Sequence, residues 1–304
     1  MPPADGAAAG AGRGAAAAAV TPALLRGWPL PSLDDGGDKH ARGTVLVVGG
    51  AASTPGAVLL AALGALRAGA GRLSVATVRS TSVGLAVALP EALVAGLPED
   101  EDGSLDPDCA EQVVASCGSA AAVVLGPGLL GKAGARSLLE RVLPDLHGDE
   151  GASVLLDAVA LTALAGAPQL LTGLAGRVVL TPNSGEMAAL LEGDDREGDD
   201  AARAVAERYG AVVAVRGAVA APDGRLWHDE AGGIGLGTSG SGDVLAGVVG
   251  GLLARGASPE QAAVWGQYLH AAAGDRLAAR VGRVGFLARE LLDEVPLVLT
   301  GLRV

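Results

Sequence analysis

The chain has 304 residues, which fits one large α/β domain or two small ones. Half of the residues are hydrophobic, but only three Trp, two Tyr and one Phe occur, so the core must be packed from aliphatic side chains. The net charge of −12 and the lack of a Lys/Arg cluster argue against nucleic-acid binding, and no apolar stretch of about 18 residues predicts a membrane span.

Residues 1–38 are rich in Ala and Gly, and we expect a flexible N-terminal segment there. The segment lacks the basic start and strongly apolar centre of a signal peptide. Residues 39–304 are expected to form one domain. Cys109 and Cys117 match no metal-binding spacing, which favours free thiols in the cytoplasm, although a disulfide between them stays open.

In chain order, the strand expected over Thr44–Val48 is followed by a helix running to Ala68, with Ser53 or Thr54 as its cap and Pro55 in its first turn. Further apolar strands are expected over residues 73–78, 122–125, 153–156, 177–180 and 211–215. Helices are expected over 243–254, 259–279 and 285–292. Apolar strands alternating with helices predict a mostly parallel sheet that is covered on both faces.

Most of these strands end in Gly-rich or polar turns. They include Gly126-Pro127-Gly128, Asp157, the stretch Thr181–Glu186 and Arg216-Gly217. Because ligands of an open parallel sheet bind beyond the carboxyl ends of its strands, we expect one shared site there.

The loop Gly235–Gly240 leads into an apolar helix that carries Asp243 in its first turn. The first amides of a helix have no internal partner and attract anions, so small residues there allow a phosphate to approach. Asp243 can then accept a hydroxyl proton. Alternatively, Asp243 merely favours the helix start, and Thr238, Ser239 and Ser241 are simple caps.

Other candidates keep two interpretations. Glu186 can orient a Mg²⁺-bound water or a phosphate, or it can be an ordinary first-turn carboxylate; Asp157 is a site residue or a helix cap. His270 is expected to be packed or at the surface rather than a catalytic base. Gly126–Ala133 nearly matches a phosphate-binding loop, but Ala133 lacks the required hydroxyl, so Gly126 and Gly128 are expected to contact substrate through their backbone.

The ordered set of motifs resembles the NAD(P)H-hydrate dehydratase family. The motifs are Gly43–Gly50, Pro55-Gly56-Ala57, Arg67–Gly71, Pro90-Glu91-Ala92, Gly126-Pro127-Gly128, Leu180–Met187 and Gly240–Gly247. This resemblance implies a ribokinase-like three-layer α/β/α fold. It also implies repair of hydrated NADH and NADPH with ADP (or ATP) and Mg²⁺, releasing AMP and phosphate, by a homo-oligomer, a tetramer by family analogy.

The resemblance also implies residue roles. Asp243 would deprotonate the ring hydroxyl, and the amides of Gly240, Ser241 and Gly242 would hold the transferred phosphate. Ala57, Gly126, Gly128, Asp157 and Asn183 would contact the hydrated cofactor. The nucleotide would lie against Arg216, Gly217, Ala218, Val219, Ala220 and Gly242.

Three positions depart from the family pattern. Asn183-Ser184 replaces the usual His-Pro, Arg216 stands where Lys is usual, and Val159 replaces a second acidic residue after Asp157. Because few residues precede Lys39, we expect this chain to lack the epimerase domain that is often fused ahead of this module. A small-molecule kinase of the same fold and a nucleotide-sensing protein without turnover remain alternative interpretations.

Overall fold

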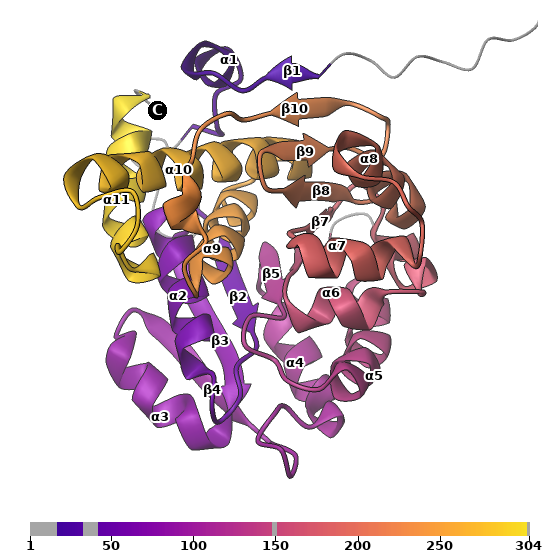
Figure 1. Ribbon diagram of the computed structural model, residues 1–304. Helices are drawn as coiled ribbons and strands as arrows, with labels where there is room; N and C mark the ends of the chain where they lie inside the picture. The colour runs from indigo at the N-terminus through magenta and orange to yellow at the C-terminus, as the bar shows by residue number, and fades with distance from the viewer. Residues whose placement is uncertain (1–16, 33–41, 148–150, 303–304) are drawn as a thin grey trace, which may run out of the picture.

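The structure is a computed structural model that describes residues 17–32, 42–147 and 151–302 (Figure 1). The strands are β1 (Ala18–Ala19), β2 (Thr44–Val48), β3 (Arg72–Val78), β4 (Ala92–Leu97), β5 (Ala122–Leu125), β6 (Ser153–Leu156), β7 (Val178–Leu180), β8 (Val212–Val215), β9 (Ala218–Ala220) and β10 (Leu226–His228). The helices are α1 (Pro22–Gly27), α2 (Pro55–Arg67), α3 (Arg79–Ala88), α4 (Ala110–Cys117), α5 (Lys132–Val142), α6 (Val159–Leu164), α7 (Ser184–Leu191), α8 (Gly198–Tyr209), α9 (Ser241–Ala254), α10 (Pro259–Arg280) and α11 (Ala288–Gly301).

The strands form a single sheet in the order β1-β10-β9-β8-β7-β6-β5-β2-β3-β4. All pairs from β4 to β8 are parallel, whereas β9 pairs antiparallel with β8 and β10 antiparallel with β9. The chain builds outward in opposite directions from β2 and β5, so the switch point of the topology lies between these two strands. The predicted mostly parallel sheet is confirmed.

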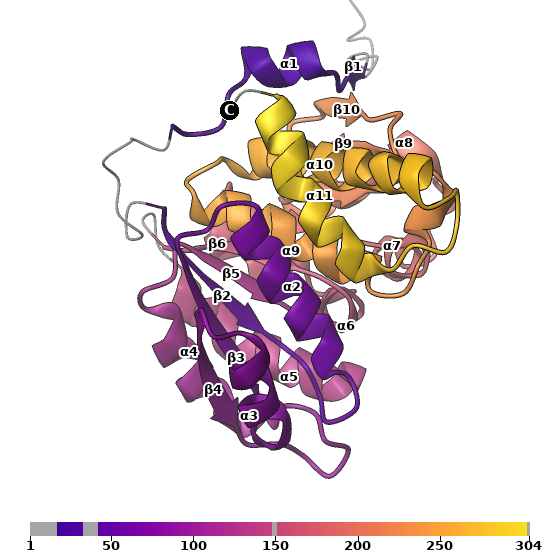
Figure 2. The ribbon, with the colours of Figure 1, turned by 90° about the vertical axis from the view of Figure 1, so that its left-hand side faces the viewer.

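Each face of the sheet is covered by its own layer of helices. Val45 and Val47 of β2 point into a core shared with α2, α9, α10 and α11, whereas Leu46 and Val48 point into a core shared with α4 to α8. This alternation follows from the two-residue period of a strand. The helices of the first layer lie together in front of the sheet in Figure 2, and the three-layer α/β/α architecture is confirmed.

Helices α2 and α9 are in backbone contact, and this contact positions the predicted catalytic helix. A Cβ added at Gly247 of α9 would lie 2.1 Å from the carbonyl oxygen of Ala61, and one added at Gly251 would lie 2.4 Å from that of Ala65. The two helices therefore run side by side in the same direction. Glycine is required at both positions because any side chain would collide with backbone.

The N-terminal segment is ordered where the structure describes it, which corrects the expectation of flexibility over 1–38. Strand β1 pairs with β10, and the Thr21 side chain caps α1. The ring of Trp28 stacks on Trp227 with the ring centroids 5.9 Å apart, and Trp265 Nε1 donates to the Trp28 carbonyl over 2.9 Å. The prediction is wrong for residues 17–32, because a short strand and one tryptophan anchor them. Residues 1–16 and 33–38 lie outside the described residues.

Cys109 and Cys117 are both buried and free. Within residues 17–32, 42–147 and 151–302, no helix is long and apolar enough to cross a lipid bilayer.

Candidate active site

The turns after β2 and β5 interlock at the switch point of the sheet. The Gly50 N–H donates to the Pro127 carbonyl over 2.8 Å, and Thr54 Oγ1 donates to the Gly128 carbonyl over 2.6 Å. Gly128 has φ +70°, and a Cβ there would lie 2.9 Å from the Cβ of Ala57. Two of the predicted substrate-contact residues, Ala57 and Gly128, therefore lie side by side.

Gly126 connects this corner to the neighbouring strand. It has φ +129°, and a Cβ there would lie 1.9 Å from the carbonyl oxygen of Asp157, which follows β6. Only glycine allows this conformation and this close approach. The structure thus brings Ala57, Gly126, Gly128 and Asp157 to one edge of the sheet.

Helix α9 begins with free backbone amides, as predicted. Its N-cap, Gly240, has φ +86°, and no side chain caps the helix. The Ser241 N–H donates to the Thr238 carbonyl over 3.2 Å, whereas the amides of Gly240, Gly242 and Asp243 form no hydrogen bond with any described residue. The expected set of free amides therefore differs at one position. The Ser241 amide closes a turn, and the free amides are those of Gly240, Gly242 and Asp243.

Asp243 lies half-buried in the first turn of α9. Burial raises the pKa of its carboxyl group to about 6, with a smaller contribution from the negative charge of Glu186. The group is therefore mostly ionised at neutral pH but far more basic than an ordinary aspartate. This pKa suits a general base that works near neutrality.

Asp157 has the opposite protonation. It is 5% exposed, and Thr181 Oγ1 donates to its Oδ1 over 2.7 Å. Burial raises its pKa to about 8; the charges of Asp243 and Glu186 raise it further and the bond from Thr181 lowers it. At neutral pH Asp157 is mostly protonated beside an ionised Asp243, and such a separation of pKa values assigns different roles to two carboxyl groups.

Asn183 and Glu186 form a capping box at the start of α7. Asn183 Oδ1 accepts from the amides of Gly185 and Glu186 over 2.9 and 3.0 Å, and Glu186 Oε2 accepts from the Asn183 amide over 2.8 Å. Glu186 is therefore a first-turn carboxylate of α7 that also completes its cap. The cap uses one oxygen of Glu186, Oε2. Burial raises the pKa of Glu186, although a side-chain hydrogen bond with Asn183 acts to lower it.

A pocket of about 310 Å³ lies beside the start of α9. Its wall is formed by the carboxyl ends of β7 and β8, a loop and two helices: Thr181–Ser184, 214–217, 231–232, 236–237, 241–242, Leu245, Gln267, His270 and Ala271. We call it the α9 pocket. Its volume is at the lower end of the range for small-molecule sites.

The α9 pocket includes part of the predicted nucleotide contacts. Arg216, Gly217 and Gly242 line it, and Arg216 is exposed, with Nη2 3.5 Å from the Gly233 carbonyl. Ala218, Val219 and Ala220 do not line it, because they form β9 and are buried within the sheet. For these three residues the structure does not support contact with a ligand in the α9 pocket.

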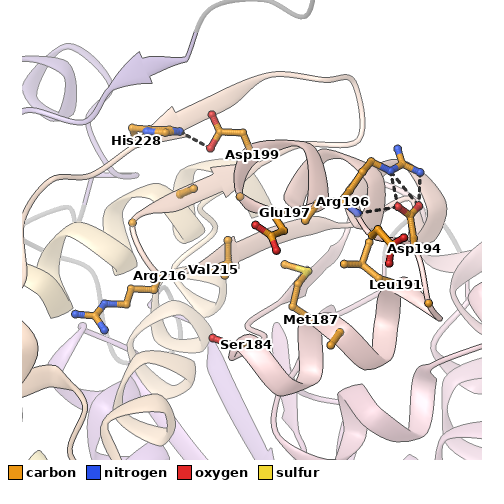
Figure 3. Close-up of a pocket in the computed structure, with 17 residues that line it drawn as sticks. Ser184, Met187, Leu191, Asp194, Arg196, Glu197, Asp199, Val215, Arg216 and His228 are labelled. Carbon is orange, nitrogen blue, oxygen red and sulfur yellow. Dashed lines mark hydrogen bonds and ion pairs between the residues drawn. The ribbon is translucent and has the colours of Figure 1, made fainter.

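A larger cavity of about 800 Å³ adjoins the α9 pocket and shares Ser184, Val215, Arg216 and Gly217 with it (Figure 3). Met187 and Leu191 of α7 form an apolar side, and the hydrogen bond between His228 and Asp199, at 2.8 Å, lies at its edge. Asp157, Glu186 and Asp243 line neither cavity. Size alone would select the larger cavity, but Asn183 and the first residues of α9, Ser241 and Gly242, line only the smaller one.

The sequence placed Thr181 in the expected site only as part of the turn 181–186, and it missed Gln267 and the contact made by His270. Thr181 follows β7 in the motif Leu180-Thr181-Pro182, which was a usable signal. His270 is buried, as expected, and its Nε2 lies 3.0 Å from both Oγ and the carbonyl oxygen of Ser241. Nothing local marks Gln267, because only the docking of α10 brings it to the pocket.

Comparisons with known proteins agree with this geometry. A family model described as NAD(P)H-hydrate dehydratase matches residues 45–297. A relative from Xanthomonas campestris, named ADP-dependent (S)-NAD(P)H-hydrate dehydratase, is 46% identical over 290 residues, which are 92% of this chain and 95% of the relative. A bifunctional NAD(P)H-hydrate repair enzyme from Moorella thermoacetica is 37% identical over 280 residues, 90% of this chain but 52% of that protein.

Solved structures show the same fold. An ADP/ATP-dependent NAD(P)H-hydrate dehydratase from Bacillus subtilis, co-crystallized with ATP/Mg²⁺, has a TM-score of 0.75 at 27% identity and covers 94% of this chain and 99% of its own. A ribokinase-like superfamily protein from Enterococcus faecalis has a TM-score of 0.80 at 23% identity, over 94% of this chain and 96% of its own. The ribokinase-like fold is confirmed.

Proposed function

The chain belongs to the NAD(P)H-hydrate dehydratase family, and we propose that it uses ADP to convert hydrated NADH or NADPH back to the reduced cofactor, releasing AMP and phosphate. One observation carries this proposal: Asp243, an ionised base of raised pKa, lies in the same helical turn as free amides beside a ligand-sized pocket. The named activity of the Xanthomonas relative, similar over nearly its whole length, supports the choice of ADP.

The proposed reaction has two steps. Asp243 accepts the proton of the ring hydroxyl, whose oxygen attacks the terminal phosphorus of ADP; the bond to the departing AMP breaks. The ring carbon–oxygen bond then breaks as phosphate leaves, and a proton lost from the adjacent carbon restores the double bond. The free amides of Gly240, Gly242 and Asp243 would hold the negative charge of the transferred group, and the α9 dipole supports them.

The remaining residues bind and orient. Ala57 and the glycines at 126 and 128 let the hydrated ring approach the backbone, and Asn183 Nδ2 can donate a hydrogen bond to it. Asp157, mostly protonated near neutrality, can donate or accept without adding negative charge. Arg216, exposed at the edge of the α9 pocket, supplies a cation for the nucleotide phosphates.

A magnesium ion fits this site. Mg²⁺ usually keeps several waters and is held by one or two carboxylates together with substrate phosphates. Glu186 has one oxygen outside the capping box, and its charge raises the pKa of Asp243, so the site has a local excess of negative charge. We propose that Glu186 holds the ion through water. The ion would neutralise phosphate charge, and the Bacillus structure named with ATP/Mg²⁺ supports its presence.

A cytoplasmic location and assembly as a homo-oligomer, a tetramer by family analogy, belong to the same proposal. Two buried free thiols support a reducing compartment. Size measurement of the purified protein by light scattering tests the oligomer.

The decisive experiment incubates purified protein with hydrated NADH and either ADP or ATP, following absorbance of the reduced nicotinamide together with AMP and phosphate. We expect Asp243→Asn to slow turnover by about 10²–10⁴, with nucleotide affinity little changed. Asp293→Asn is the matched control, because that carboxylate is exposed and pairs only with Arg67 at the surface.

Two results would contradict the proposal. Normal turnover by Asp243→Asn would exclude Asp243 as the general base. Accumulation of a stable phosphorylated product, without free phosphate, would show a small-molecule kinase instead.

A further inference from the structure

Helix α10 presents two buried polar side chains to the α9 pocket, one helical turn apart. Gln267 is 7% exposed and His270 is 8% exposed, and both line the pocket. Neither is a charged group that could bind phosphate. Their hydrogen bonds define which atoms remain available to a ligand.

A hydrogen bond identifies which end of the Gln267 amide is the nitrogen. Its nitrogen lies 3.0 Å from the Val215 carbonyl oxygen, which can only accept, so this atom must be the donor Nε2. Its Oε1 is buried and has no hydrogen-bond partner among the described residues. A buried acceptor without a donor is destabilising, and such atoms in native proteins call for a ligand or water. Because the terminal torsion of glutamine is soft, a small rotation can turn Oε1 toward a donor in the pocket.

His270 defines the phosphate end of the pocket. Its Nε2 lies 3.0 Å from the Ser241 carbonyl oxygen, so Nε2 carries the proton. Ser241 begins α9, where the free amides lie. Gln267, one turn earlier on α10, is bonded instead to the Val215 carbonyl at the end of β8, so the two side chains contact different walls of the pocket.

We propose that Gln267 is a specificity-determining residue whose Oε1 accepts a hydrogen bond from the 6-amino group of adenine. This inference rests on the proposed use of ADP. Hypoxanthine and guanine carry an oxygen at position 6, which would face Oε1 acceptor to acceptor and leave both unpaired. A site with a buried hydrogen-bonding group rejects ligands that cannot complement it.

The first test uses the unmodified protein. Calorimetry compares ADP with inosine diphosphate and with purine riboside diphosphate, which has hydrogen at position 6. We expect binding in the order ADP, purine riboside diphosphate, inosine diphosphate, with ADP favoured over inosine diphosphate by about tenfold or more. Equal affinity for all three would overturn the inference.

The second test replaces the residue. Gln267→Met keeps the volume but lacks the acceptor, so the ratio of ADP to inosine diphosphate affinity should fall by about tenfold. Gln261→Met is the control: Gln261 is equally buried on the same helix, but its amide donates to Trp28 and Pro29, away from the pocket. An unchanged ratio in Gln267→Met, or the same fall in Gln261→Met, contradicts the inference.

A third ligand distinguishes a contact of Gln267 with the base from a contact with the sugar. Binding of 2′-deoxy-ADP relative to ADP should be unaffected by Gln267→Met; a change confined to this ratio would assign Gln267 to the ribose and overturn the proposal. These measurements need no turnover. If ADP binds with the expected base preference but no reduced cofactor forms, the proposed reaction fails while the assignment of Gln267 stands.

Discussion

Thr181 Oγ1 donates a 2.7 Å hydrogen bond to Asp157 Oδ1, and both side chains are buried where the neighbouring strands β7 and β6 end. The bond holds a carboxyl group inside the protein although burial raises its pKa to about 8. A protonated Asp157 limits the negative charge around Asp243 and Glu186. The pair is thus part of the electrostatics of the site.

The Asp157→Asn variant should lose less stability than the unmodified protein when the pH is raised. The folded-state pKa of about 8 is raised above the unfolded value of about 3.9, so this group stabilises the fold fully below about pH 4 and loses that contribution as pH rises to about 8. The free energy of unfolding in urea, measured near pH 5 and pH 8.5, should differ less in the variant by roughly 4 kcal/mol. Equal pH dependence in both proteins would show that Asp157 ionises normally.

The rate of the proposed reaction should increase with pH through about 6, the pKa to which burial raises Asp243. The base must be ionised to accept a proton, so kcat/KM should fall about tenfold for each pH unit below this value. A pH–rate profile between about pH 4.5 and 8 measures this. A profile that is flat through this range would exclude Asp243 as the group that controls the rate.

Gly247→Ala should destabilise the protein by about 3 kcal/mol or more, because the new Cβ would lie 2.1 Å from the Ala61 carbonyl oxygen and separate α9 from α2. Gly84→Ala is the control: Gly84 lies in α3, and a Cβ there has nothing within 4 Å, so the change should stabilise by about 0.5–1 kcal/mol. Urea unfolding checks both. Similar stability in the two variants would contradict the backbone contact.

Trp28→Ala should lower stability by about 3 kcal/mol without changing the reaction rate. The change removes the stack on Trp227 and loosens the backbone that accepts from Trp265 and Gln261, and none of these residues lines the α9 pocket. Thermal unfolding and kcat together check this. An unchanged melting temperature would mean that residues 17–32 are not anchored as the structure shows.

Local pattern predicted much of the framework. The strand Thr44–Val48 and the strand Ala122–Leu125 were predicted with the bounds that the structure has, and α9 begins two residues before the expected start at Asp243. Continuous Val and Leu runs identify buried parallel strands, and a Gly-rich turn before an apolar helix identifies the anion site. Local pattern missed β1, β4, β9 and β10, because short or partly exposed strands carry little periodicity.

The sequence by itself determined the parallel sheet, the position of Asp243 at the start of a helix and the family of the chain, since each is encoded in neighbouring residues or in the order of motifs. Tertiary structure alone decided which polar atoms meet: Thr181 with Asp157, His270 with Ser241 and Gln267 with Val215. It also decided the raised pKa values of Asp157 and Asp243. The physical reason is that desolvation and hydrogen bonding depend on residues distant in the chain, and only packing brings them within reach.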